Sequence, residues 1–353
     1  MSTNRRIYLD FNATAPLLPA ARAAIEEALT VSGNPSSIHA EGRAARHVVE
    51  RARDRVAALV ARPREQVVFT SGGTEANALG VRTLAAAAVQ RGLPRIVAAS
   101  PLDHPSLRGA VAALGWPIVP LGAPAGLVAL GWVNHELGTL ADPALLAAAR
   151  AMGALIHVDA VQAAGKLPLA IDADALAVSA HKLGGPQGAG AVALALDADG
   201  VDAGHQERGR RPGTENALGI AGFGAAAAAA DPAAWPAVAA LGDQLEAGLV
   251  ALGARIHGAT QPRVGGTINA AFAGATGEAV VIALDLAGIA ASTGAACTSG
   301  SVQPSAVLLA LGYPADQARE AIRFSLGRST TADDIAAVLA VLPGIVARAR
   351  RHR

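Results

Sequence analysis

The sequence has few residues with reactive side chains. Its 353 residues include one cysteine, Cys297, and only two lysines, Lys166 and Lys182. A single cysteine excludes an internal disulfide framework and a cysteine-rich zinc or iron–sulfur site. Chemistry that needs a thiol therefore has one candidate residue, and chemistry that needs a lysine amine has two.

Charged residues are also scarce. They make up 16% of the chain against 52% hydrophobic residues, and the formal net charge is only +1. High apolar content with low net charge excludes an extensively disordered chain. A dedicated nucleic-acid-binding protein is usually far more basic, so we expect no direct contact with nucleic acid.

Long apolar runs are absent as well. Asp10 and Asn12 interrupt the N-terminal segment, so we expect no signal peptide. The uncharged stretch 109–135 is broken by three prolines and several glycines, whereas a membrane-spanning helix needs about 20 continuous apolar residues. We therefore expect a soluble, cytoplasmic protein with no membrane contact and no metal site.

At roughly 150 residues per domain, the length suggests about two domains. In the first two thirds, short apolar runs alternate with helical segments. The expected strands are 66–70, 95–100, 117–121, 126–133, 155–160, 175–179 and 189–196, and the expected helices are 74–90, 105–114 and 143–152. This alternation predicts an α/β domain with a mostly parallel sheet, whose functional residues gather at the carboxyl ends of the strands.

The last third has a different organisation. A helical stretch from Glu215 to about Leu252 leads into a smaller α+β region, with expected strands at 266–273 and 321–326 and helices at 278–285, 304–311 and 332–350. We place the domain boundary near residue 253. The large domain then comprises residues 16–253, and the small domain comprises residues 1–15 with 254–353 and carries the cysteine loop.

Three segments follow predicted strands and carry polar groups. Residues 71–77, Ser-Gly-Gly-Thr-Glu-Ala-Asn, end one strand and open a helix. Glycines there let backbone N–H groups approach an anion, and a helix N-terminus favours negative charge. A simple tight turn with a capping threonine is the alternative.

The second segment is Ser179-Ala-His-Lys182. Lysine is seldom buried without a partner, and burial lowers the pKa of its amine, which then suits nucleophilic attack and a Schiff base. A lysine on an exposed loop is the alternative.

The third segment is His157-Val-Asp-Ala-Val-Gln162. A strand-end carboxylate such as Asp159 needs a cationic partner, and the protonated pyridine nitrogen of pyridoxal phosphate is one. An aspartate that caps the next helix is the alternative. Together, in this order on a parallel sheet, the three segments provide what a pyridoxal-phosphate enzyme requires.

At this point the chain resembles a known family, the cysteine desulfurases of the class V aminotransferase group, which have the fold type I of pyridoxal-phosphate enzymes. The resemblance runs from Ile7 to Arg328. The motifs that carry it are 33–37, 70–75, 157–160, 206–209, 213–214, 296–299 and 322–327. It implies a large domain with a mostly parallel sheet and a smaller α+β C-terminal domain.

The resemblance implies a role for each matching residue around the cofactor. Lys182 would hold pyridoxal phosphate as a Schiff base and move protons, and His104 would stack on the ring and shuttle protons. Asp159 would pair with the pyridine nitrogen and Gln162 with the phenolic oxygen. The implied phosphate ligands are Gly73, Thr74, Ser179, His181 and, from the other subunit of a homodimer, Thr214.

It also implies the substrate chemistry. Asn34 and Arg323 would hold the carboxylate of L-cysteine, because a planar, permanently charged fork suits that task. Cys297 would take the sulfur as a persulfide, release L-alanine and pass the sulfur to an acceptor protein, an iron–sulfur scaffold or a tRNA-thiolation factor. A buried, inert cysteine is the alternative.

Two features depart from the family's pattern. His135 stands in Val133-Asn-His-Glu136 where the family usually has a second asparagine that contacts the cofactor. A shifted loop that uses Asn134 is the alternative. The connection 121–133 is also short, since the family usually carries a helix-containing stretch there, and partner binding could change as a result.

Other functions remain open at this stage. Selenocysteine lyase or another class V lyase or transaminase uses the same cofactor machinery, although a transaminase needs no thiol. A weakly active partner in sulfur relay is a further alternative. The basic C-terminus, 348–353, is typical of a solvated helix end, with docking of an acceptor as the other interpretation.

Overall fold

The computed structural model describes residues 6–196, 204–294 and 303–351. The chain divides into two compact units. The large unit comprises residues 14–133 and 141–232, and the small unit comprises residues 1–13, 134–140 and 233–353. The domain boundary predicted from the sequence assigns residues 134–140 and 233–253 to the large domain, whereas the structure groups them with the small unit. In the structure, helix α7 (Trp235–Ala251) packs on α11 (Ala332–Arg351) and on strand β10 (Thr267–Ala271), which groups it with the small unit.

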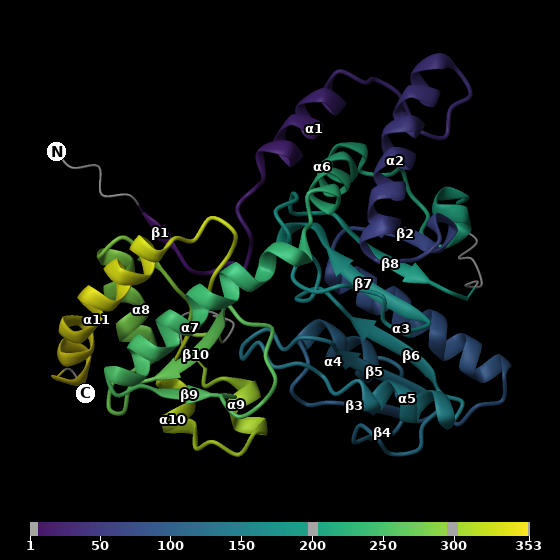
Figure 1. Ribbon diagram of the computed structural model, residues 1–353. Coiled ribbons are helices and arrows are strands. Elements are labelled where there is room, and N and C mark those ends of the chain that lie inside the picture. The colour runs from purple at the N-terminus through teal and green to yellow at the C-terminus, as the bar shows by residue number, and fades with distance from the viewer. Residues whose placement is uncertain (1–5, 197–203, 295–302, 352–353) are drawn as a thin grey trace. The chain divides into compact units, whose positions relative to one another are not determined.

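A seven-stranded sheet forms the centre of the large unit (Figure 1). Its order is β2-β8-β7-β6-β5-β3-β4. The strands are β2 (Val67–Thr70), β3 (Val97–Ala99), β4 (Ile118–Val119), β5 (Leu127–Gly131), β6 (Leu155–Asp159), β7 (Ala175–Ser179) and β8 (Gly190–Leu194). All seven lie within the predicted ranges. Most are apolar runs that are buried along their whole length, as expected for strands covered on both faces.

The directions of the strands decide where the site lies. The neighbours from β7 through β6, β5 and β3 to β4 are parallel, whereas β8 runs antiparallel to both β7 and β2. Six strands therefore point the same way, and β8 alone runs against them. The carboxyl ends of β2, β6 and β7 meet at one edge of the sheet, which is where the sequence predicted functional residues.

Helices α3 (Gly73–Gln90), α4 (Pro105–Ala112) and α5 (Ala144–Ala151) match the predicted helices. Helices α3 and α4 pack on each other and both contact β5, and their apolar residues form a shared core with the sheet. Two further helices, α1 (Pro19–Leu29) and α2 (Ala40–Leu59), were not predicted. Helix α2 carries many charged residues, and only a stripe that includes Val49 and Val56 is buried.

The predicted helical stretch 215–252 is interrupted. Helix α6 (Ala217–Ala228) ends before Asp231-Pro232, a short 3₁₀ turn η4 (Pro232–Ala234) follows, and α7 begins at Trp235. Proline has no backbone N–H and restricts the residue before it, which accounts for the break. Within the described ranges no single helix is long and apolar enough to cross a membrane, although the bent pair α6 and α7 meets that test when taken together.

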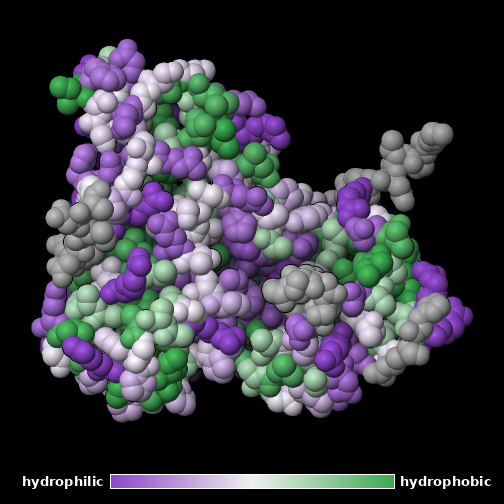
Figure 2. Space-filling model, turned by 180° about the vertical axis from the view of Figure 1, so that it is seen from behind, coloured by the Kyte–Doolittle hydropathy of each residue, from purple (hydrophilic) through white to green (hydrophobic). Residues whose placement is uncertain are grey.

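The described residues of the small unit form two sheets. Strands β9 (Arg255–His257), β10 and β12 (Ala321–Ser325) form an antiparallel sheet in the order β12-β10-β9, against which α7 and α8 (Gly277–Leu286) pack. Strand β1 (Ile7–Tyr8) pairs with β11 (Ile289–Ala290). Two short helices complete the unit, α9 (Ala306–Ala310) and α10 (Ala315–Arg319). Polar and apolar residues are interspersed on the face of the molecule that Figure 2 shows.

Candidate active site

Three strand ends of the large unit come together around the start of α3. A β-carbon added to Gly73, the first residue of α3, would lie 2.8 Å from Cγ2 of Val161 and 3.5 Å from Cβ of Ser179. Gly73 is thus the residue that lets the helix approach the ends of β6 and β7 so closely. The structure therefore brings together the three segments that the sequence singled out.

Asp159, the last residue of β6, is buried and its carboxylate is held in place. Oδ1 accepts a hydrogen bond from the backbone N–H of Val161 at 3.0 Å, and Oδ2 accepts one from Nδ2 of Asn77 at 2.8 Å. Asn77 in turn accepts at Oδ1 from Nε2 of His157, at 2.9 Å. Burial lowers the pKa of His157 to about 3, so this ring is neutral. These contacts fix the orientation of the Asp159 carboxylate.

Electrostatics place His104, Asp159 and Lys182 in one neighbourhood. Burial lowers the pKa of His104, the Asp159 carboxylate raises it, and the Lys182 ammonium lowers it. Lys182 closes a short 3₁₀ turn, η2 (Ala180–Lys182), directly after β7. The adjacent His181 has its pKa lowered to about 4 by burial and by Lys182. An amine, a carboxylate and an imidazole from three separate segments thus lie close enough for their charges to interact.

The side chain of Gln162 is also fixed. It is 7% exposed, and its Oε1 accepts a hydrogen bond from Nζ of Lys166 at 3.2 Å. Lys166 itself is only 6% exposed, so the second lysine of the chain is buried within the turn that follows β6. Because Oε1 takes the lysine's hydrogen bond, the amide group is oriented with Nε2 as its donor.

The start of α3 provides donors for an anion. The backbone N–H groups of the first turn, from Gly73 and Thr74, have no partner within the helix. Ser179 is 1% exposed, and its Oγ has no hydrogen-bond partner among the described residues. An unused buried hydroxyl beside a helix N-terminus fits a phosphate group, because it provides a donor that the protein itself does not satisfy.

In the small unit, Arg323 of β12 is held from several sides. Its NH2 donates to Oδ1 of Asp10 at 2.7 Å, and its NH1 donates to the backbone carbonyl of His135 at 3.1 Å. The side chain is 6% exposed, and Nε has no partner within the described part of the chain. Two of the five guanidinium N–H groups thus hold the side chain in place.

His135 lies in the same small unit as Arg323, in the short segment 134–140. Its Nε2 lies 3.6 Å from Oε1 of Glu136, an ion pair only when the imidazole is protonated. Burial raises the pKa of Glu136 to about 7. Oδ1 of Asn134 accepts from the backbone N–H groups of Glu136 and Leu137, so this oxygen stabilises the turn itself.

Three predicted residues remain, Asn34, Thr214 and Cys297. Asn34 and Thr214 belong to the large unit and are exposed. Asn34 accepts from the backbone N–H of Ser36 at 2.9 Å. Cys297 lies outside the described residues. No group of three or more His, Cys, Asp or Glu that could hold a metal ion occurs among the residues that the structure describes.

Sequence reasoning missed three contributors. Asn77 is the last residue of the predicted anion-binding turn, yet only the fold reveals its bond to Asp159. Asp10 ends the first segment that resembles the family, but no spacing in the sequence pairs it with Arg323, which lies more than 300 positions away. Lys166 sits four residues after Gln162, a helical spacing that could have suggested the contact.

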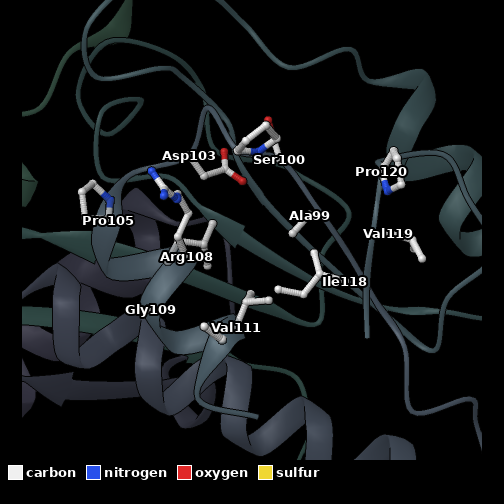
Figure 3. A pocket seen from close by; sticks show the side chains of 13 residues that line it. Ala99, Ser100, Asp103, Pro105, Arg108, Gly109, Val111, Ile118, Val119 and Pro120 are labelled. Atoms are coloured by element: carbon white, nitrogen blue, oxygen red, sulfur yellow. The ribbon is translucent and has the colours of Figure 1, made fainter. Parts of the chain in front are cut away.

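A separate cavity of about 950 Å³ lies between β3, α4 and β4 (Figure 3). Its lining is mainly aliphatic, with Asp103 and Arg108 as the charged residues. Burial raises the pKa of the Asp103 carboxyl to about 6. The connection from β4 to β5, residues 120–126, contains no helix, so the cavity lies at a sheet edge that this short turn leaves without a helical cover.

Comparisons with known proteins show the family of this chain. The family model for aminotransferase class-V matches residues 7–114 and 121–338. The chain belongs to this family. A cysteine desulfurase from Cereibacter sphaeroides is 40% identical over 98% of this chain and 97% of its own length. Another, from Enterobacter agglomerans, is 38% identical over 98% of this chain and 94% of its own length.

Several solved structures share the fold of this chain. A NifS-like protein from Rickettsia africae is 26% identical, with a TM-score of 0.84 over 97% of this chain and 99% of its own. DndA from Streptomyces lividans is 31% identical, with a TM-score of 0.73 over 89% of this chain and 97% of its own. The predicted α/β fold, that of fold type I enzymes, is confirmed.

Proposed function

We propose that this class-V family member is a pyridoxal-phosphate-dependent cysteine desulfurase that converts L-cysteine to L-alanine. The observation that carries the proposal is the convergence of Lys182, Asp159 and His104 at the carboxyl ends of the strands. The similarity to cysteine desulfurases along nearly the whole chain supports this reaction rather than another of the family.

The residues of the large unit fit the cofactor. The unpartnered Ser179 hydroxyl and the first turn of α3 provide donors for its phosphate, and His181 adds a further polar group nearby. When bound, pyridoxal phosphate supplies an aldehyde that condenses with amines and a ring that stabilises negative charge at the substrate Cα. Asp159 would keep the pyridine nitrogen protonated, and Nε2 of Gln162 would donate to the phenolic oxygen.

Lys182 is the amine for covalent attachment. It follows the end of a strand, its charge acts on His104 as that of Asp159 does, and its Nζ would take and return the proton at the substrate Cα. Lys166 is a poor substitute because its ammonium is buried and already bonded to Gln162. His104 would stack on the cofactor ring.

Arg323 would hold the carboxylate of the substrate. Asp10 and the carbonyl of His135 fix the guanidinium through two of its five N–H groups, which leaves further N–H groups as donors for the substrate. A fixed fork binds a carboxylate through two parallel hydrogen bonds, which orients the substrate as well as binding it. Asn34 would be a second contact to the same carboxylate.

Cys297 would receive the sulfur. Its thiolate forms a bond to the substrate sulfur while the bond between that sulfur and the substrate Cβ breaks, and the electron pair of the broken bond stays with the carbon. After protonation at Cα and Cβ the organic product leaves as alanine, and Cys297 carries a persulfide. An acceptor protein, an iron–sulfur scaffold or a tRNA-thiolation factor, would take the sulfur from it.

The enzyme would act as a homodimer. Thr214 is exposed and follows Gly213, whose backbone N–H donates to Oε1 of Gln206. An exposed threonine on a loop anchored in this way supports a role as phosphate ligand for the other subunit. Light scattering would then give twice the mass of one chain, and a monomer with full activity would contradict it. Location in the cytoplasm stays a prediction.

The test is a product assay with purified protein, pyridoxal phosphate, L-cysteine and a reductant. We expect equal amounts of alanine and sulfide from the wild type, and neither from Lys182→Ala. Cys297→Ser should release no sulfide. L-Selenocysteine and a keto acid are tested as alternative substrates of both proteins. Two results together would show that the protein is a transaminase instead. The wild type would release no sulfide from L-cysteine, and Cys297→Ser would transaminate the keto acid at the wild-type rate.

A further inference from the structure

A single buried asparagine connects the two groups that would contact the cofactor ring. Asn77 is 0% exposed and lies in the first turns of α3. Its Nδ2 donates to Oδ2 of Asp159 at 2.8 Å and also to Oγ of Ser106 at 3.0 Å. Its Oδ1 accepts from Nε2 of His157 at 2.9 Å. Every hydrogen-bonding atom of this amide is therefore used, and its orientation is determined.

His157 confirms which way the asparagine amide points. The pKa of His157 is lowered to about 3 by burial, so its ring carries one proton. Its Nδ1 is buried and has no partner among the described residues. The proton therefore lies on Nε2, where it can be donated to Oδ1 of Asn77, and Nδ2 must face Asp159 and Ser106.

The Ser106 hydroxyl extends the connection to His104. Nδ1 of His104 accepts from the backbone N–H of Ser106 at 3.1 Å, so this ring nitrogen carries no hydrogen in the structure. Oγ of Ser106 lies 2.7 Å from the same Nδ1 and must be the donor in that contact. The neutral ring of His104 therefore carries its proton on Nε2.

We propose that Asn77 is a positioning residue that couples His104 to Asp159. Its amide holds the Asp159 carboxylate directly, and through the Ser106 hydroxyl it holds His104 in the neutral form with the proton on Nε2. The functional part of this inference rests on the proposed function, since both residues matter to the reaction only if they contact the cofactor. The tautomer itself is a property of the protein alone.

The coupling has a chemical consequence. A protonated His104 would need a hydrogen on Nδ1, where the backbone N–H and the hydroxyl of Ser106 already point. These two donors therefore favour the neutral ring and leave Nε2 as the nitrogen that exchanges a proton. Of the charged neighbours, Asp159 raises the pKa of His104 and Lys182 lowers it, and Asp103 directly precedes it in the chain.

The first measurement uses the cofactor-free protein labelled with ¹⁵N-histidine, with the His104 signals identified by their loss in His104→Gln. We expect an unprotonated Nδ1 and a protonated Nε2 in the wild type. Ser106→Ala should move the titration midpoint of His104 to higher pH, because a donor that favours the neutral ring is lost. A proton on Nδ1 in the wild type, or an unchanged midpoint in Ser106→Ala, would overturn the inference.

The second measurement compares the affinity for pyridoxal phosphate. Asn77→Leu keeps the approximate volume and removes both donors, and we expect the Kd to rise about tenfold, typical for loss of a buried hydrogen bond to a charged group. Ser106→Ala should change the Kd much less. The matched control is Asn269→Leu, which removes another fully buried asparagine bonded to a histidine, His257, in the small unit.

The outcomes separate this inference from the proposed function. If Asn269→Leu raises the Kd as much as Asn77→Leu, general destabilisation explains the effect and the coupling to Asp159 is wrong. If Asn77→Leu does not fold, the titration of Ser106→Ala decides. If the wild type binds no pyridoxal phosphate, the proposed function fails, while the tautomer of His104 in the cofactor-free protein still tests the hydrogen-bond chain.

Discussion

Arg323 and Asp10 form an ion pair with 2.7 Å between NH2 and Oδ1. The pair connects the segment that follows β1 to strand β12. A backbone bridge between Asp10 and Ser325 lies beside this pair. The pair fixes a cation that is 6% exposed on a strand whose residues are all buried. A substrate carboxylate would therefore meet a guanidinium that is already oriented.

The orientation of Arg323 leads to a prediction about substrate binding. Arg323→Lys keeps the charge but cannot present two parallel N–H groups. We expect KM for L-cysteine to rise about tenfold or more, from the loss of a charge-assisted hydrogen bond, with a smaller change in kcat. Steady-state alanine formation measures both. A fall in kcat at unchanged KM would mean that Arg323 does not bind the substrate.

The two lysines should behave differently when the cofactor is trapped by borohydride reduction. We expect the wild type to carry the label on Lys182, and Lys182→Ala to carry none. Lys166→Met should keep the label on Lys182 but bind the cofactor more weakly, because Gln162 loses the contact that orients its amide. Peptide mass spectrometry locates the label. Its appearance on Lys166 in the wild type would reverse the assignment.

Glu136 should make stability depend on pH. Its pKa is raised from 4.5 to about 7 by burial, so between these values the folded chain keeps a proton that the unfolded chain has lost. The unfolding free energy therefore falls as pH rises through this window. The unfolding free energy of Glu136→Gln minus that of the wild type should therefore increase by on the order of 3 kcal/mol from pH 4.5 to pH 8. Urea unfolding at both pH values checks this, and a constant difference would contradict it.

A buried ion pair anchors the loop that precedes Thr214. NH1 and NH2 of Arg53 each donate to one oxygen of Glu207 at 2.7 Å, and the two side chains are 7% and 1% exposed. Glu207 also adopts a φ of 48°, which is strained for a side chain of this size. We expect Glu207→Gln to cost about 3 kcal/mol or more of unfolding free energy, because it leaves Arg53 without its main partner.

The control for this pair lies on the surface. Arg51 and Glu27 form an ion pair at 3.1 Å with side chains 39% and 64% exposed, and Arg51→Ala should cost less than about 1 kcal/mol. Equal losses in the two variants, measured by urea unfolding, would show that burial of the Arg53–Glu207 pair has no special effect.

The central sheet could be predicted from the sequence because buried parallel strands are nearly continuous apolar runs, as β5, β6 and β7 are. The same pattern indicated which residues lie at the carboxyl ends of these strands, because those residues come directly after the apolar runs. Helix α2 escaped prediction because most of its surface is charged. The direction of β8 could not be read from its sequence either, since a buried antiparallel strand between two neighbours has the same apolar pattern.

Contacts between distant residues explain the rest of what the sequence missed. Asp10 and Arg323, or Asn77 and Asp159, are far apart in the chain and carry no spacing signal. The contacts of His135 could not be predicted from the sequence for the same reason. Only the fold reveals that its carbonyl accepts from both Arg323 and Asn12, while its ring lies near Glu136.

The central claim is that Cys297 receives the sulfur of L-cysteine, and its most direct test is a single turnover without reductant. Enzyme loaded with pyridoxal phosphate is mixed with less than one equivalent of L-cysteine, and the peptide that contains Cys297 is weighed by mass spectrometry. The account predicts one added sulfur atom on Cys297 for each alanine formed. Alanine formation with an unchanged mass of that peptide would contradict it.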